Sequence, residues 1–253
     1  MAQAREPIYN NSDMRFVGER KALAALVLAF WLLLFFLNAF LGPPQFQAMF
    51  VGLSGAYFLA FFAVVAGYFW ARWYALGLGL SGVAVGVLGW WQNGLDIGVI
   101  LWGGGHALLT IALLGKGPAS VFDGRKDWRE RYRMDENAAN RLGKAIMRAG
   151  ASLPYLIVAG LAPKQSLGEA LVGFAAVALG MAALVGLSRL RTWSLVAAAG
   201  AAVLAVVAVS GDAWFSTTTT DWTFVPEAGT VAGALLTLAI LPFARPIVRF
   251  LRA

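Results

Sequence analysis

Cysteine is absent from all 253 residues of the chain, and histidine occurs once, at His106. Without cysteine there can be no disulfide framework, thiolate metal site or cysteine nucleophile. The signatures of nucleotide-binding loops, zinc proteases and serine hydrolases (GxxxxGK[ST], HExxH and GxSxG) are missing as well. These absences predict a protein that is not an enzyme and that carries no cofactor and no metal.

Charge is also scarce, since Lys, Arg, Asp and Glu make up 13% of the residues against 60% for hydrophobic types. The mean hydropathy of +0.70 excludes an ordinary soluble domain. A charged side chain at the centre of an inserted helix costs about 2.5 to 3.5 kcal/mol, so charge-free stretches of about 20 residues are candidate membrane spans. The sequence therefore predicts an all-α, polytopic integral membrane protein with a single membrane domain over residues 1–253.

Charge-free stretches of this kind predict eight transmembrane helices. They lie at 22–41, 48–71, 73–91, 96–115, 149–163, 169–188, 192–211 and 228–246. The first two form a predicted helical hairpin, because Gly42-Pro43-Pro44 interrupts a long run without charge. The fifth stretch is the weakest of the eight, since it is short, contains Pro154 and begins beside Arg148.

Basic residues indicate the orientation of these spans. Lys and Arg are favoured in cytoplasmic loops, so we expect a cytoplasmic N-terminus and alternating spans that return the C-terminus to the same side. All 20 Lys and Arg residues except Lys164 then lie inside. The same bias explains most of the net charge of +7. We therefore expect no nucleic-acid partner. We also expect the chain to lie in the inner membrane of a prokaryote.

Small residues mark the spans that are expected to pack closely. Gly79, Gly82, Gly86 and Gly89 share one face of the third span, where they let a neighbouring backbone approach. They predict helix packing or an oligomer contact. Together with small residues in the last three spans, they place the packed centre in spans three, six, seven and eight. The bulky first two spans are expected to face lipid.

His106 is the ionisable residue nearest a predicted bilayer midplane, and glycines 103–105 precede it. Thr110, Asp96 and Asn38 complete a candidate intramembrane polar site. One interpretation is a proton-handling or substrate-binding residue that lines a cavity. The other is a neutral histidine that is hydrogen-bonded to a carbonyl or hydroxyl in a tight helix contact. No second intramembrane carboxylate or histidine completes a relay, which favours the second interpretation.

The segment 116–148 is the substantial extramembrane element, and we expect it to be a cytoplasmic amphipathic loop. Its second half is predicted to begin at Asp135 as an interfacial helix that leads into the fifth span. Basic and aromatic side chains in it are expected to contact anionic lipid headgroups or a protein partner. These residues are Trp128, Arg131, Arg141, Lys144 and Arg148.

Two motifs of this segment resemble those of SdpI-like small multi-pass bacterial membrane proteins. The motifs are Glu130-Arg-Tyr132-Arg-Met-Asp135 and Arg141-Leu-Gly143-Lys144, followed by a span. The resemblance covers about residues 95–188, and Arg141 stands one position closer to Gly143 than in that family. It implies a bacterial or archaeal membrane protein of the immunity or signalling kind, whose cytoplasmic segment meets a partner. It transfers no catalytic residue.

Two functions of different classes follow from these observations. The preferred one is a non-enzymatic accessory, regulatory or immunity-like membrane protein whose basic cytoplasmic loop contacts lipid or a partner. The alternative is a small-solute or ion permease with His106 in the translocation path. The two differ in whether His106 lines a water-accessible cavity or is sealed between helices.

Overall fold

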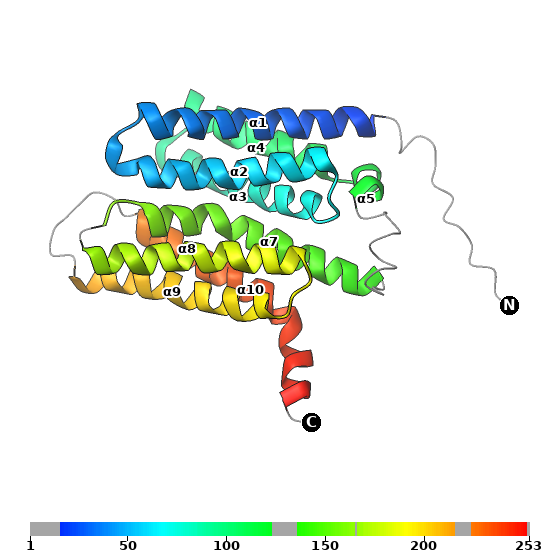
Figure 1. The fold of residues 1–253 in the computed structure, drawn as a ribbon. Helices are drawn as coiled ribbons and strands as arrows, with labels where there is room; N and C mark the ends of the chain where they lie inside the picture. Colours follow the sequence, from blue (N-terminus) through cyan, green and yellow to red (C-terminus); the bar gives the residue numbers. More distant parts are fainter. Residues whose placement is uncertain (1–15, 123–135, 165, 216–223, 252–253) are drawn as a thin grey trace.

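The computed structural model describes residues 16–122, 136–164, 166–215 and 224–251 (Figure 1). Within these ranges every regular element is a helix. The elements are α1 (Val17–Leu41), the 3₁₀ turn η2 (Pro44–Phe46), α2 (Gln47–Ala66), α3 (Ala71–Asn93), α4 (Ile97–Leu113), α5 (Lys116–Phe122), α7 (Glu136–Leu161), α8 (Leu167–Ser188), α9 (Trp193–Phe215) and α10 (Phe224–Leu251). The described chain is therefore all-helical, as its sequence predicts.

Contacts divide the eight long helices of the described residues into two groups of four (Figure 1). In the first group α1 contacts α2 and α4, and α3 contacts α2 and α4. In the second group each of α7, α8, α9 and α10 packs on its neighbours in the chain, and α10 returns to contact α7. The groups meet where α2 and α3 contact α7, so the junction between them is made by three helices.

Four helical segments are long and apolar enough to cross a membrane, namely α1, η2 with α2, α3 and α8. Helices α4 and α5 meet the same criterion only as a pair, which is bent by 71° at the break between them. Gly115 lies at this break with φ at 100°, a conformation that favours glycine. The described apolar parts of α9 and α10, Trp193–Val207 and Glu227–Phe243, are shorter. The chain thus has four or five candidate membrane spans.

The second predicted span, 48–71, is longer than its helix. Helix α2 ends at Ala66 because Gly67 takes the left-handed conformation, with φ at 71°. The N–H of Gly67 donates to the carbonyl of Val64 at 3.2 Å, which closes the last turn. The predicted span was extended to Arg72 because only charged residues were used to set its ends. Gly67 is uncharged, so it was not recognised as the end of the helix.

The predicted interfacial helix and the fifth span are one continuous helix, α7. Its first half is packed against protein: Ile146 is fully buried, and a Cβ on Gly143 would lie 2.7 Å from Cδ2 of Trp73 on α3. The prediction divided the helix because Arg148 interrupts the apolar run. Asp135, the predicted cap, lies outside the described residues.

Helix α7 is also central to the packing, since it contacts α2, α3, α8, α9 and α10. Two small residues of the predicted sixth span, Gly173 and Gly180, face it. A Cβ on Gly160 of α7 would lie 2.6 Å from the carbonyl oxygen of Gly173 on α8, so the two backbones touch. The predicted packed centre was incomplete, because it left out this fifth span.

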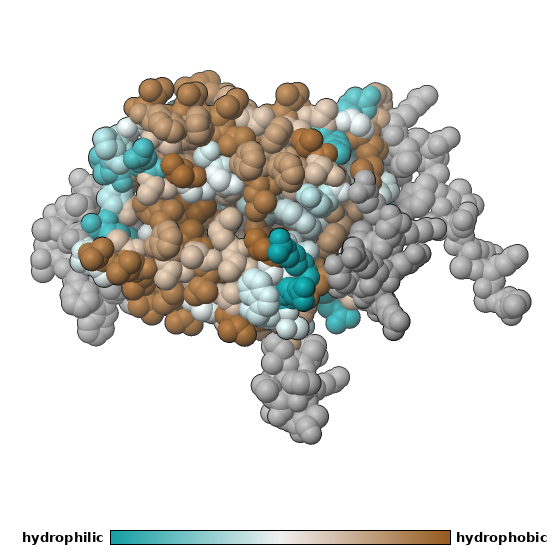
Figure 2. Space-filling model, in the orientation of Figure 1, coloured by the Kyte–Doolittle hydropathy of each residue, from teal (hydrophilic) through white to brown (hydrophobic). Residues whose placement is uncertain are grey.

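Helices α1 and α2 each have one buried and one exposed apolar face. The exposed large apolar residues of these helices are Leu26, Phe30, Leu33, Phe36, Leu37, Phe40, Leu41, Val51, Phe58, Phe62 and Val65. Figure 2 shows hydrophobic surface over this side of the molecule. Apolar patches of this extent are unusual on soluble proteins and are typical of interaction surfaces. The expectation that the first two spans face lipid therefore applies to one face of each helix.

Basic residues of α1 lie at the ends of two neighbouring helices. Arg20 donates from Nη2 to the carbonyl of Ile111 at 2.7 Å and from Nε to that of Ala112 at 3.1 Å, in the last turn of α4. Lys21 donates from Nζ to the carbonyl of Val65 in α2 at 3.1 Å. The last carbonyls of a helix lack intrahelical donors and carry partial negative charge. Both cations therefore stabilise helix C-termini at this end of the bundle.

Candidate functional site

His106 lies within α4 and is fully buried, with 0% of its surface exposed. The space for its ring comes from α3, where a Cβ on Gly82 would lie 2.6 Å from the imidazole Nδ1. A Cβ on Gly79 would overlap Oγ1 of Thr110, one turn further along α4. The remaining two glycines of the stripe on α3 also face α4. The stripe is thus occupied by a helix of the same chain.

Both ring nitrogens of His106 have protein partners. Nδ1 lies 2.8 Å from the backbone carbonyl oxygen of Trp102, and Nε2 lies 2.6 Å from the hydroxyl oxygen of Tyr57 on α2. A carbonyl oxygen only accepts hydrogen bonds, so Nδ1 donates, and a neutral ring then accepts the Tyr57 hydroxyl at Nε2. This is the arrangement that the second interpretation of His106 describes, a neutral residue in a tight helix contact.

Aromatic rings surround the imidazole. Trp31 of α1 stacks on it, with centroids 4.5 Å apart and planes at 28°, and the Trp102 ring lies 4.9 Å away. Gly105 permits this approach, because a Cβ there would lie 3.1 Å from the Trp31 ring. Among the described residues neither indole N–H has an acceptor. Ring packing therefore holds both indoles, and all four helices of the first group converge on His106.

Trp31 and Tyr57 are members of the cluster that the sequence reasoning missed. Both lie well inside predicted spans, whereas Trp and Tyr are enriched at the ends of spans. A tyrosine in that position also carries a hydroxyl that needs a hydrogen-bond partner away from water. A polar aromatic residue inside a span is therefore the signal that points to a partner such as His106.

The other predicted members of the polar site are placed differently. Thr110 is adjacent to His106, but its Oγ1 donates to the carbonyl of His106 within α4 at 2.9 Å. Asp96 is exposed and caps α4, since its Oδ1 accepts the backbone N–H three residues later at 2.9 Å. Asn38 donates from Nδ2 to a carbonyl of the preceding turn of α1 at 2.8 Å. The structure brings Thr110 and His106 together and leaves Asp96 and Asn38 near helix ends.

We expect Asp96→Ala to lower the free energy of unfolding by about 1 kcal/mol, because the first turn of α4 then loses its side-chain acceptor. Asp96→Ser keeps an oxygen at the cap and should restore most of this loss. Titration with dodecyl sulfate in mixed micelles, followed by circular dichroism, measures both values. Equal losses in the two variants would contradict the capping role.

The basic residues predicted to contact lipid or a partner are in part engaged within the chain. Arg141 and Lys144 are exposed on α7. Arg148 donates from Nη1 to a backbone carbonyl of α10 at 2.8 Å, so it joins two helices of the second group. Trp128 and Arg131 lie outside the described residues. Arg141 and Lys144 thus form the described exposed part of this predicted surface.

A cavity of about 230 Å³ lies beside the histidine cluster and is bounded by α1, α2, α3, α4 and α7. Its lining consists of Phe35, Met49, Phe50, Leu53, Tyr57, Ser81, Gly82, Val85, Trp102, Pro154, Tyr155 and Val158. His106 does not take part in this lining, and the walls are almost wholly apolar. Among the described residues no group of three or more His, Cys, Asp or Glu could hold a metal ion.

Comparisons with protein-family models, with curated proteins and with solved structures found no match. The resemblance to SdpI-like proteins therefore stays a prediction, and its first motif, 130–135, lies outside the described residues. What the site can do follows from its geometry. An imidazole that is 0% exposed and bonded at both nitrogens presents no atom to a substrate.

Proposed function

We propose that the chain is an eight-span integral membrane protein of a prokaryotic inner membrane, with both termini cytoplasmic and a non-enzymatic accessory or regulatory role. In this role its basic cytoplasmic end contacts anionic lipid headgroups. A protein partner, which the resemblance to immunity-type proteins implies, would meet the same charges. The observation that carries the proposal is the gathering of basic residues at one end of the helix bundle.

In the first helix group the basic residues share one end. Arg20 and Lys21, at the start of α1, contact the last turns of α4 and α2. Arg72, at the start of α3, lies with Nη1 3.5 Å from the carbonyl oxygen of Leu113 at the end of α4. The four helices therefore run antiparallel in sequence order, and the start of α1 and the end of α4 lie on the same side.

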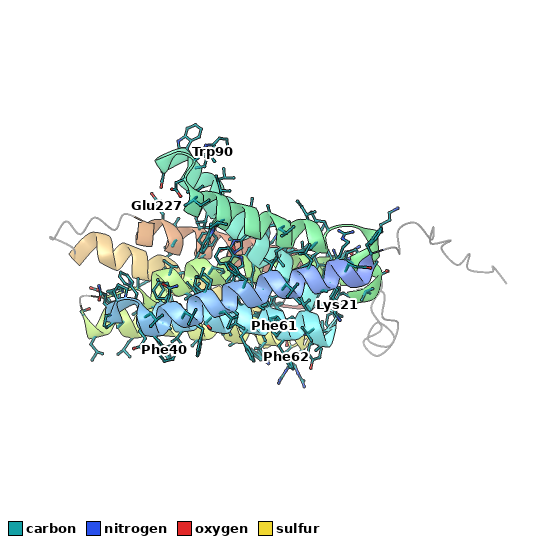
Figure 3. All side chains as sticks on the ribbon, turned by 90° about the horizontal axis from the view of Figure 1, so that it is seen from above. Lys21, Phe40, Phe61, Phe62, Trp90 and Glu227 are labelled. Carbon is teal, nitrogen blue, oxygen red and sulfur yellow. The ribbon has the colours of Figure 1, made fainter. Side chains whose placement is uncertain are left out.

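Apart from Lys164, the described basic side chains of the second helix group lie at the same end. They are Arg141, Lys144 and Arg148 on α7, and Arg189 and Arg191 in the turn between α8 and α9. Figure 1 places the start of α7 and this turn at the end where α1 begins. Figure 3 shows Phe40, Trp90 and Glu227 toward the opposite end from Lys21. A concentration of Lys and Arg on one side is typical of the cytoplasmic side of a membrane protein.

The positions of α7, α9 and α10 support eight spans rather than five. Helices α7 and α9 pack along α8, and α10 packs on α7 and α9, while α8 is itself apolar and long enough to cross. Helices packed lengthwise on a spanning helix occupy the same depth of the bilayer. The outward residues agree, since Phe174 on α8 and Val196 and Val203 on α9 are exposed. These exposed apolar side chains are suited to contact with the hydrocarbon core of a bilayer.

The sealed position of His106 supports the accessory role over transport. A translocation path needs polar groups that water or a solute can reach, and neither nitrogen of His106 is open. The described cavity is apolar and excludes His106 from its wall. Nothing in the described residues favours the permease alternative.

Charge reversal tests the proposed contact with lipid headgroups. The variant Arg141→Glu with Lys144→Glu should retain less anionic phospholipid than the wild-type chain, because each basic residue near an anionic surface contributes about 1 kcal/mol. Lys164→Glu, at the opposite end, is the matched control and should retain wild-type amounts. Native mass spectrometry of the chain released from nanodiscs of mixed anionic and zwitterionic lipid measures the ratio. An unchanged ratio in the double variant would contradict the proposal.

A further inference from the structure

The apolar cavity lies at the junction of the two helix groups. Its walls come from Phe35 of α1, Leu53 of α2 and Val85 of α3 on one side, and from Val158 of α7 on the other. It lies toward the end of the bundle where α2 begins and α7 ends, because Met49 and Val158 are close to those helix ends. This is the half of the bundle opposite to the basic end.

The hydroxyl groups on the cavity wall all donate to protein atoms. Tyr57 pairs with Nε2 of His106 at 2.6 Å. Tyr155 donates to the carbonyl of Ser81 at 3.1 Å, and Ser81 donates to its own helix at 2.8 Å. None of these hydroxyl hydrogens is left for a polar ligand. The rest of the lining is apolar except for the indole N–H of Trp102, which has no acceptor among the described residues but is itself buried. The recognition that this wall offers is therefore apolar contact.

The size of the cavity points to an organic occupant rather than water. A cavity of about 150 Å³ with apolar walls stays dry and takes up a ligand such as benzene, because a buried water needs two to four polar partners. The cavity here is larger, at about 230 Å³, and supplies few such partners. Met49 in its wall is flexible enough to follow the outline of an elongated apolar ligand.

We propose that this cavity binds the hydrocarbon chain of a membrane lipid, inserted between α2 and α7 at the junction of the two helix groups. Acyl chains are the apolar molecules at highest concentration around a bundle whose outer faces are apolar. The chain fills the space with contacts to Phe35, Leu53, Val85 and Val158 and keeps its polar head outside the cavity. This inference rests on the membrane embedding proposed above.

Photolabelling with a phosphatidylcholine that carries a diazirine in its acyl chain tests the site. The wild-type chain in nanodiscs is irradiated, digested and mapped by mass spectrometry. Label is expected on the cavity walls at Val85 and Val158, in addition to lipid-facing residues of α1 such as Phe30. A parallel experiment with a free fatty acid that carries a diazirine shows whether the bound hydrocarbon comes from a phospholipid or from a fatty acid. Label from either probe at the cavity walls supports the site.

Variants that fill the cavity with a larger side chain test the same site, and a variant outside the cavity serves as their control. Val85→Phe and Val158→Phe are expected to abolish label at the cavity walls and to leave label on α1 unchanged. Val87→Phe adds the same atoms at a position that is 56% exposed and should keep the wild-type pattern. Label on α1 without label at the walls of the wild-type cavity would overturn the inference. Absence of label on α1 as well would instead overturn the proposed embedding. The labelling pattern of the wild-type chain tests the inference even if the Val85→Phe and Val158→Phe variants fail to fold.

Discussion

Gly77→Ala is expected to lower the free energy of unfolding by about 3 kcal/mol, the upper part of the usual range for overpacked sites. The added Cβ would overlap the carbonyl oxygen of Met147 and lie 2.8 Å from the backbone nitrogen of Ala151, both on α7. Backbone atoms in the middle of a helix cannot rotate away as a side chain can. The methyl group must therefore push α3 from α7, at the junction of the two helix groups.

Gly55→Ala is the matched control for this variant. Gly55 lies within α2, and a Cβ there has no atom within 4 Å outside its own helix turn. Alanine is favoured over glycine inside a helix by about 0.5 to 1 kcal/mol, so this variant should be neutral or slightly more stable. Dodecyl sulfate titration in mixed micelles measures both variants. Similar stabilities for Gly77→Ala and Gly55→Ala would mean that α3 and α7 are not in close contact.

His106→Leu is expected to cost about 2 to 3 kcal/mol, because it removes the acceptor of the Tyr57 hydroxyl and leaves that hydroxyl buried without a partner. Tyr57→Phe alone should cost about 1 kcal/mol, since it leaves Nε2 of His106 without its donor. The double variant should be more stable than His106→Leu, because it leaves no orphaned group of the pair. The coupling energy is then about 1 to 2 kcal/mol, toward the upper end of the range known for hydrogen bonds between membrane helices.

Tyr74→Phe supplies the reference for this cycle. Tyr74 is buried like Tyr57, but its hydroxyl donates to the carbonyl of Ala56 at 3.0 Å rather than to His106. Its effect should therefore add to that of His106→Leu without coupling. Coupling of equal size in both cycles would show that the interaction is not specific to the 2.6 Å contact between Tyr57 and His106.

The positions of the helices could be predicted from charge because hydrocarbon excludes ionised side chains. That reasoning fails where a helix ends at an uncharged residue, as α2 does at Gly67, and where a charge lies inside a helix, as Arg148 does in α7. Arg148 is accommodated by a carbonyl of α10, a partner 90 residues away. Contacts of this kind depend on which helices are neighbours, and residue spacing within one span carries no such information.

The candidate site could be predicted only in part, because its members come from different helices. The isolated histidine and the glycines of α3 stand out in sequence, and the structure places Gly82 against the ring of His106. The hydrogen-bond partner Tyr57 and the stacking partner Trp31 come from α2 and α1. Spans one and two carry many bulky aromatic residues, and their sequence alone does not mark which of these face inward. Pairing between spans is decided by packing.

The number and direction of the spans are tested most directly by single-cysteine labelling, which the absence of native cysteine makes free of background. With a membrane-impermeant maleimide on intact cells, Gln45→Cys and Lys164→Cys should react. Arg141→Cys and Thr192→Cys should react only after the membrane is permeabilised. Protection of Lys164→Cys, or reaction of Arg141→Cys from outside, would contradict the eight-span arrangement with its basic end in the cytoplasm.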